Sequence, residues 1–197
     1  MDQIEQNQEP RDRRPAPDDS FWVEEGRLLA GPYPGSQNRE EAEAKISALL
    51  DVGVDSFVDL TEECETGPGG DPVVPYDGLM YEIARERGIP ARYLRMPITD
   101  LGVPQQWHME AMLDLIEVCT RDGGIVYVHC MGGVGRTGTV LGCRMIEAGT
   151  PPSEVLNVIA EKRAVKLRSD RLSPETDEQR EFVINWKRTS TPVPGRS

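Results

Sequence analysis

One short run, residues 125–138, constrains the fold of this chain more than any other. Residues 125–128 are apolar or aromatic and follow two glycines, which predicts a buried strand. The run continues as HCMGGVGRTG, and the apolar stretch after it predicts a helix from Thr137 to Ala148 that ends at Gly149. A strand, a glycine-rich loop and a helix in this order direct backbone N–H groups and a positive helix end at one point. The sequence therefore predicts a phosphate-binding loop within an α/β fold.

The loop also contains side chains suited to chemistry on phosphate. Cys130 is a potential nucleophile, because helix N-termini and nearby cations lower thiol pKa values from about 8.5 to roughly 3.5–7.5. Arg136 presents a planar, permanently charged fork that can bind two phosphoryl oxygens. Thr137 can hydrogen-bond the sulfur, and His129 is expected to brace the loop through its ring nitrogens, without a role in proton transfer. The remaining loop residues are expected to bind phosphate through their backbone, with glycines allowing tight closure: Met131, Gly132, Gly133, Val134 and Gly135.

These residues match the HC-x5-R-[ST] signature of the cysteine-based protein tyrosine phosphatases. From about Phe21 to Trp186 the chain resembles a compact dual-specificity phosphatase of the group related to cyclin-dependent kinase inhibitor 3. The resemblance implies a mostly parallel central sheet with helices on both faces, and catalysis through a phosphocysteine intermediate without a cofactor. It also implies phosphotyrosine and phosphoserine/threonine proteins as substrates.

The resemblance assigns the general acid to Asp100, thirty residues before Cys130. The leaving oxygen needs a proton, because expelling an unprotonated alkoxide or phenolate is costly. Asp100 lies on a loop bounded by proline and glycine, after a strand expected at 91–94. Tyrosine-specific members have Trp-Pro-Asp here and this chain has Pro-Ile-Thr-Asp, so their substrate preference is not carried over.

Near the C-terminus, Gln179 resembles the glutamine that orients the attacking water in related phosphatases. Ser173 followed by Pro174 is typical of a helix N-cap and first position. On the expected helix, Gln179 shares an apolar face with Phe182, Val183 and Trp186. The alternative for Gln179 is an amide that only hydrogen-bonds the backbone of the cysteine loop.

The order of the other segments predicts alternating strands and helices in one α/β layer structure. Residues 61–77 form a long loop rich in glycine and proline, and Tyr76 and Tyr81 are placed to border a substrate cleft. The remaining elements expected are a hairpin at 21–30, a helix with a capping box at Asn38, a strand at 56–60, a helix with an apolar stripe from Met109 to Cys119, and a helix after Ser153.

Composition sets further expectations. With 197 residues, one catalytic domain is expected at 20–187, with a disordered tail at 1–19 and a flexible one at 188–197. A net charge of −12 disfavours nucleic-acid and anionic-membrane partners. Two histidines and no CxxC pair give no metal site. Without signal-peptide or membrane-span patterns, we expect a cytoplasmic monomer.

Three other functions stay open from the sequence. The loop can hold phosphorylated partners without turnover, or it can belong to a rhodanese-like sulfurtransferase, which the Arg136–Thr137 pair disfavours. Within phosphatases, the substrate can be a small molecule or an RNA 5′-phosphate. Oxidation of Cys130 is a further hypothesis, with Cys64, Cys119 or Cys143 as resolving partner.

Overall fold

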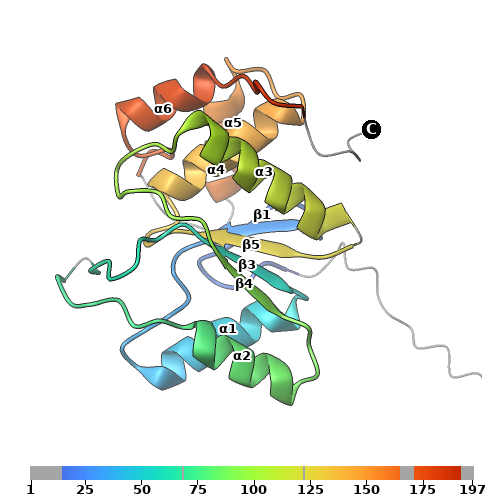
Figure 1. Cartoon of the computed structure of the whole chain (residues 1–197), viewed down its shortest axis with the longest axis vertical. Coiled ribbons are helices and arrows are strands. Elements are labelled where there is room, and N and C mark those ends of the chain that lie inside the picture. The colour runs from blue at the N-terminus through green and yellow to red at the C-terminus, as the bar shows by residue number, and fades with distance from the viewer. Residues whose placement is uncertain (1–14, 68, 122, 165–170, 192–197) are drawn as a thin grey trace, which may run out of the picture.

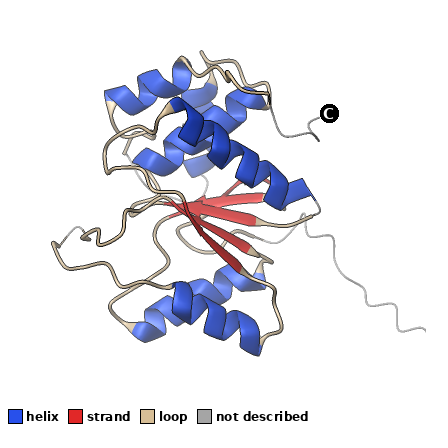
Figure 2. Cartoon of the chain, viewed as in Figure 1, coloured by secondary structure: helices blue, strands red, loops and turns tan. Residues whose placement is uncertain are grey.

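The protein consists of a central β-sheet between two helical layers (Figures 1 and 2). The computed structural model describes residues 15–67, 69–121, 123–164 and 171–191. Helices α1 and α2 cover one face of the sheet, and α3 to α6 cover the other. The strands are β1 (Phe21–Glu24), β2 (Leu28–Gly31), β3 (Ser56–Asp59), β4 (Arg92–Arg95) and β5 (Val126–His129). The helices are α1 (Arg39–Asp51), α2 (Asp77–Glu86), α3 (Gln106–Arg121), α4 (Gly135–Glu147), α5 (Val155–Ala164) and α6 (Asp177–Ile184).

The strand order is β1-β2-β5-β3-β4, with β5 at the centre. Only the β1–β2 pair is antiparallel, and the other three pairs are parallel. The last residue of β5, His129, pairs with Gly31 of β2 on one side and Asp59 of β3 on the other. The carboxyl ends of three parallel strands therefore meet at one edge, where ligands bind in open α/β sheets. The predicted fold class is confirmed.

Each face of the sheet packs on its own apolar core. All four residues of β2, β3 and β5 are buried, as expected for strands covered on both sides. The predicted stripe of α3 is buried, and it packs with α4, α5 and α6 against one face. Ile46, Leu49 and Leu50 of α1 pack against the other face together with Met80 of α2. This rigid scaffold holds the loops at the carboxyl edge.

Both helix caps differ in part from the sequence prediction. Asn38 Oδ1 accepts hydrogen bonds from the backbone N–H of Glu40 and Glu41, but the reciprocal half of a capping box is replaced by Ser36, whose Oγ accepts from Asn38 N–H. A complete capping box occurs instead at α6, between Thr176 and Gln179. Ser173 was therefore the wrong cap, because its hydroxyl donates to Val134 O at 2.7 Å.

Parts of both predicted tails pack on the domain. Ala16 is buried in the core on the α1 side. Near the other end, Arg188 is ion-paired with Glu147, and the Thr189 backbone donates to Glu110. The rest of the predicted tails, 1–14 and 192–197, lies outside the described residues. Within the described ranges, the structure holds no helix with the length and apolar character needed to cross a membrane.

Candidate active site

The glycine-rich loop lies between the end of β5 and the start of α4, and it forms the floor of a cavity of about 420 Å³. The first turn of a helix leaves backbone N–H groups without intrahelical partners. Val134, the N-cap residue of α4, makes no side-chain cap hydrogen bond, so these N–H groups are not satisfied by their own N-cap. The cavity is lined by Glu65, Thr66, Gly67, Asp100, Leu101, Cys130, Met131, Gly132, Val134, Gly135, Arg136, Arg171, Glu175 and Gln179. The fold thus brings together predicted site residues from three separate segments: Asp100, the loop with Cys130 and Arg136, and Gln179.

Arg136 is held by two carboxylates. Glu65 accepts from Nη1 at 2.7 Å and from Nη2 at 2.6 Å, and Asp100 Oδ1 lies 3.0 Å from Nη2. Nη1 also donates to the backbone carbonyls of Leu60 and Ile98. Burial alone lowers the pKa of Arg136, but its hydrogen bonds with Glu65 raise that pKa above its ordinary value. The guanidinium is therefore charged and fixed in orientation.

Two buried polar atoms in this loop have no hydrogen-bond partner among the described residues: Arg136 Nε and Thr137 Oγ1. Arg136 is 1% exposed and Thr137 is fully buried. Leaving a buried polar group unpaired costs about 1–3 kcal/mol, and such groups call for an explanation. The sequence predicted a hydrogen bond from the Thr137 hydroxyl to the Cys130 sulfur. The structure does not contain that hydrogen bond. Both atoms are free to donate to a bound anion.

His129 lies behind the loop, fully buried. Its Nδ1 is 3.4 Å from Cys130 O, and its Nε2 is 2.6 Å from the hydroxyl of Tyr76. Because a carbonyl only accepts, Nδ1 carries the proton and Nε2 accepts from Tyr76. Burial lowers the pKa of His129, and the nearby Asp59 carboxylate opposes that decrease in part. The ring therefore connects the loop to α2 as a neutral group.

Gln179 lies against the start of α4 and uses both ends of its amide. Its Oε1 accepts from the backbone N–H of Glu175 and Thr176, and its Nε2 donates to Gly102 O at 3.0 Å. A Cβ on Gly135 would come within 2.9 Å of Gln179 Oε1. The amide therefore joins α6 to the Asp100 loop, rather than to the cysteine loop that the alternative reading had named.

Glu65, which pairs with Arg136, is a site residue that the sequence did not identify. The long loop after β3 was expected to place tyrosines at the cleft, and this was wrong. Tyr76 is 1% exposed and bonded to His129, and Tyr81 accepts from Tyr93 N–H. Neither lines the cavity. An acidic residue in a long loop directly after a buried strand was the available signal, but it does not specify a partner.

The other cysteines differ in setting. Cys119 and Cys143 are buried in the apolar core, and burial raises the pKa of Cys143. Cys64 is exposed and precedes Glu65. Of the three resolving partners suggested from the sequence, Cys64 is thus the accessible one.

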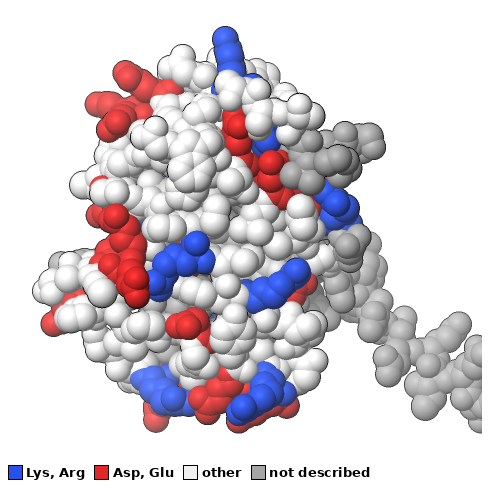
Figure 3. Space-filling model, in the orientation of Figure 1, with Lys and Arg blue, Asp and Glu red and all other residues white. Residues whose placement is uncertain are grey.

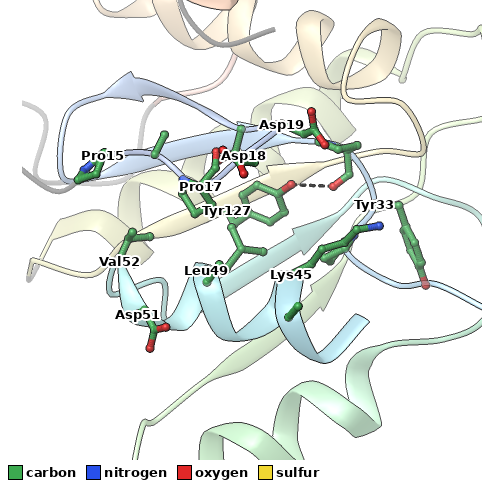
Figure 4. A pocket seen from close by; sticks show the side chains of 16 residues that line it. Pro15, Pro17, Asp18, Asp19, Tyr33, Lys45, Leu49, Asp51, Val52 and Tyr127 are labelled. Atoms are coloured by element: carbon green, nitrogen blue, oxygen red, sulfur yellow. Dashed lines mark hydrogen bonds between the residues drawn. The ribbon is translucent and has the colours of Figure 1, made fainter. Parts of the chain in front are cut away.

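A larger cavity, about 670 Å³, lies apart from these residues, between α1 and the segment 15–20 (Figure 4). Tyr127 points into it from β5 and donates to Pro32 O at 2.6 Å. Its remaining lining is largely apolar and proline-rich, with Lys45 and Asp51 at α1. None of the predicted catalytic residues lines it.

A thiol and a guanidinium held by one glycine-rich loop, between the central parallel strand and a helix, define the class of cysteine-based phosphatases. The chain belongs to the family described as "Swiss Army Knife protein, DSP-PTPase phosphatase domain", whose model matches residues 17–184. These residues therefore form a domain of the dual-specificity and tyrosine phosphatase superfamily, and the resemblance drawn from the sequence is confirmed.

Among curated relatives, protein 067L of Invertebrate iridescent virus 3, named as a tyrosine phosphatase, is 33% identical over 129 residues. The match covers 63% of this chain and 44% of that relative, so the chain spans less than half of its length. The crystal structure of Tk-PTP in the active form is 26% identical with a TM-score of 0.61, and the match covers 84% of this chain and 93% of that one.

More distant structures show the fold alone. Kinase associated phosphatase is 13% identical with a TM-score of 0.60, over 87% of this chain and 93% of that one. The PP-IP phosphatase Siw14 of S. cerevisiae is 14% identical with a TM-score of 0.59, over 87% and 86% of the two chains. PTPMT1 in complex with PI(5)P is 20% identical with a TM-score of 0.59, over 84% and 95%. One fold thus serves phosphatases named for different substrates.

Proposed function

We propose that this chain hydrolyses phosphomonoesters of proteins, phosphotyrosine and phosphoserine/threonine, through a phosphocysteine on Cys130. The principal support is a pair of buried donors that have no partner among the described residues, Arg136 Nε and Thr137 Oγ1, on the same strand–loop–helix segment as that thiol. A phosphoryl group would satisfy Nε, and the sulfur, as thiolate or leaving group, would satisfy the hydroxyl.

The guanidinium of Arg136 has one edge left for substrate. Glu65 occupies the edge formed by Nη1 and Nη2, and the second edge consists of the unpartnered Nε and the Nη2 hydrogen that faces Asp100. A phosphate that binds bidentately at this second edge takes the place of the Asp100 carboxylate. Substrate binding would thereby release Asp100 from Arg136.

Asp100, once released from Arg136, is the proposed general acid. Its carboxylate first takes a proton from solvent. The thiolate of Cys130 attacks phosphorus, the bond from phosphorus to the leaving oxygen breaks, and that oxygen takes this proton, which leaves Asp100 as a carboxylate. Charge on the equatorial oxygens is stabilised by Arg136 and by the N–H groups at the start of α4. The product is an alcohol or phenol and a phosphocysteine.

In the second half-reaction, water attacks the phosphocysteine and gives its proton to Asp100. The sulfur–phosphorus bond breaks, and inorganic phosphate and the thiolate are formed. Gln179 is proposed to direct this water. The hydrogen bond from Gln179 Nε2 to Gly102 O keeps the amide beside the Asp100 loop. If Nε2 exchanges Gly102 O for the attacking water, the amide directs that water.

The charge around the cavity favours a substrate with a single phosphate. Among the described lining residues, the cations are Arg136 and Arg171, and the acids are Glu65, Asp100 and Glu175. Figure 3 shows more carboxylates over α6 and lower on the same side of the molecule. Further phosphates on an inositol ring would meet these acids without added cations. The proposed substrate class is therefore a phosphoprotein rather than an inositol polyphosphate.

The test is hydrolysis of p-nitrophenyl phosphate with EDTA, comparing the native chain with Cys130→Ser and Asp100→Asn. We expect activity that survives EDTA, is lost with Cys130→Ser and falls at least severalfold with Asp100→Asn. A folded native chain without turnover from pH 5 to 8 would refute the enzyme and favour a phosphate-binding module. Faster hydrolysis of inositol polyphosphates or RNA 5′-phosphates than of phosphopeptides would refute the protein substrate.

A further inference from the structure

Three carbonyl groups in and next to the cysteine loop accept hydrogen bonds from residues outside the loop. His129 O accepts from Leu60 N–H at 2.9 Å, and Met131 O accepts from Tyr33 N–H at 3.0 Å. Val134 O accepts from Ser173 Oγ at 2.7 Å. In a peptide unit the N–H points opposite to the C=O, so turning the carbonyls outward turns the N–H groups toward the cavity.

One residue of this loop, Gly133, adopts a left-handed backbone conformation. Its φ is 63°, in the left-handed region, and glycine adopts either sign of φ at little cost. Its carbonyl accepts a hydrogen bond of 2.5 Å from Nη1 of Arg163, on the last turn of α5. If this peptide rotated, a carbonyl dipole would face the incoming phosphate. Arg163 therefore restrains the peptide unit that follows this left-handed glycine.

Arg163 is an unusual group to find in this position. It is 4% exposed, its guanidinium lies 5.8 Å from the centre of the Phe21 ring, and the described residues provide no carboxylate within ion-pair distance. Burial lowers the pKa of Arg163, and the charge of Cys130 opposes that decrease. Burying a cation without an acidic partner costs free energy, so a structural role alone is a poor explanation.

We propose that Arg163 is a positioning residue of the phosphatase site: it fixes the Gly133 carbonyl away from the cavity so that the loop N–H groups bind phosphate. The inference rests on the proposed function only in that the bound anion is phosphate. Arg163 contacts no substrate; it acts through Gly133, and its charge adds to the positive potential behind Cys130.

The experiment compares Arg163→Met and Arg163→Lys with Arg144→Met. Arg144 is a matched control, because it is buried on α4 but donates to Glu24 and Glu117 and not to the loop. Isothermal titration calorimetry with inorganic phosphate measures the affinity of the loop for phosphate directly, and it needs no turnover. Kinetics with p-nitrophenyl phosphate and thermal unfolding complete the set.

We expect Arg163→Met to weaken phosphate binding about tenfold and to lower kcat about 100-fold, since a displacement of about 1 Å costs about that much. Arg163→Lys keeps a charged donor and should stay within about threefold of the native affinity. Arg144→Met should lower the unfolding temperature without changing phosphate affinity. A native chain that binds phosphate but does not turn over would contradict the proposed function and leave this inference intact.

Native phosphate affinity in a folded Arg163→Met variant would overturn the proposal, and so would an equal loss of affinity in Arg144→Met. If Arg163→Met does not fold, Phe21→Leu removes the ring beneath the guanidinium and keeps the arginine. A loss of affinity of about threefold in Phe21→Leu then supports the proposal, and unchanged affinity overturns it.

Discussion

Replacing Gly133 with alanine should damage the site far more than the same change at Gly132, one residue earlier. A Cβ at Gly133 would lie 2.5 Å from both C and O of Gly31 and 2.8 Å from Pro32 N, all backbone atoms. The two segments would have to separate by roughly 0.9 Å to restore ordinary contact. Among the described residues, a Cβ at Gly132 meets Arg171 Nη1 at 3.7 Å and Val134 Cγ2 at 3.8 Å, both ordinary contacts.

The cost at Gly133 has two parts. Alanine in the left-handed region costs about 1–2 kcal/mol, and forcing packed segments apart costs about 1–3 kcal/mol. For a chain of this size, a total of about 3 kcal/mol lowers the unfolding temperature by about 6–12 °C. Because the displaced backbone binds phosphate, kcat/KM should fall about 100-fold.

Differential scanning calorimetry and p-nitrophenyl phosphate hydrolysis on Gly133→Ala and Gly132→Ala measure both effects. Gly132→Ala should unfold within about 3 °C of the native chain, since an unstrained surface change costs little. Equal unfolding temperatures for the two variants, or native activity in Gly133→Ala, would show that the loop is not restrained by Gly31 as described.

Three other changes test other parts of the site. Glu65→Gln removes the charge that faces the buried Arg136, so we expect a loss of about 2 kcal/mol, an unfolding temperature lower by about 4–8 °C and roughly tenfold lower kcat/KM; native stability would contradict this. Burial lowers the pKa of His129, so below its ordinary value of 6.5 the unfolded chain binds more protons than the folded chain, and the free energy of unfolding falls as pH drops from 7 to 5. Urea titrations at several pH values should show this slope reduced in His129→Gln, and an unchanged slope would exclude His129 as its source. Gln179→Ala should slow hydrolysis of the phosphocysteine, so rapid-quench kinetics should give a product burst near one equivalent, whereas a linear time course would contradict the proposed water role.

The elements that could be predicted are those whose signal is local. The strand–loop–helix run around Cys130, the hairpin and the buried stripe of α3 all follow from the period of apolar residues and from glycine positions. The sheet type also followed, because strands that alternate with helices pair in parallel.

The features that were missed depend on contacts between distant segments. Ser173 is a favourable helix cap, but Val134 O, 39 residues earlier, accepts its hydroxyl instead. Tyr76 ends a loop rich in glycine and proline and was expected at a substrate cleft, yet its hydroxyl contacts His129 in the core. Glu65 follows β3 and Arg136 follows β5, so the pairing of these two strands brings the two side chains together. Local sequence preference does not determine whether a polar side chain faces solvent or bonds a distant segment of the chain.

The position of β5 has a consequence for the newly made chain. β1 pairs with β2 and β3 pairs with β4, but these two ribbons share no strand pairing until β5 inserts between β2 and β3. During synthesis, both ribbons leave the ribosome before residues 126–129 do. Two open strand edges that are buried in the folded chain, those of β2 and β3, are then exposed together, which favours pairing with other chains. The strand that ends in the catalytic loop is therefore also the strand that closes the sheet, and a nascent chain stalled before it should depend on chaperones.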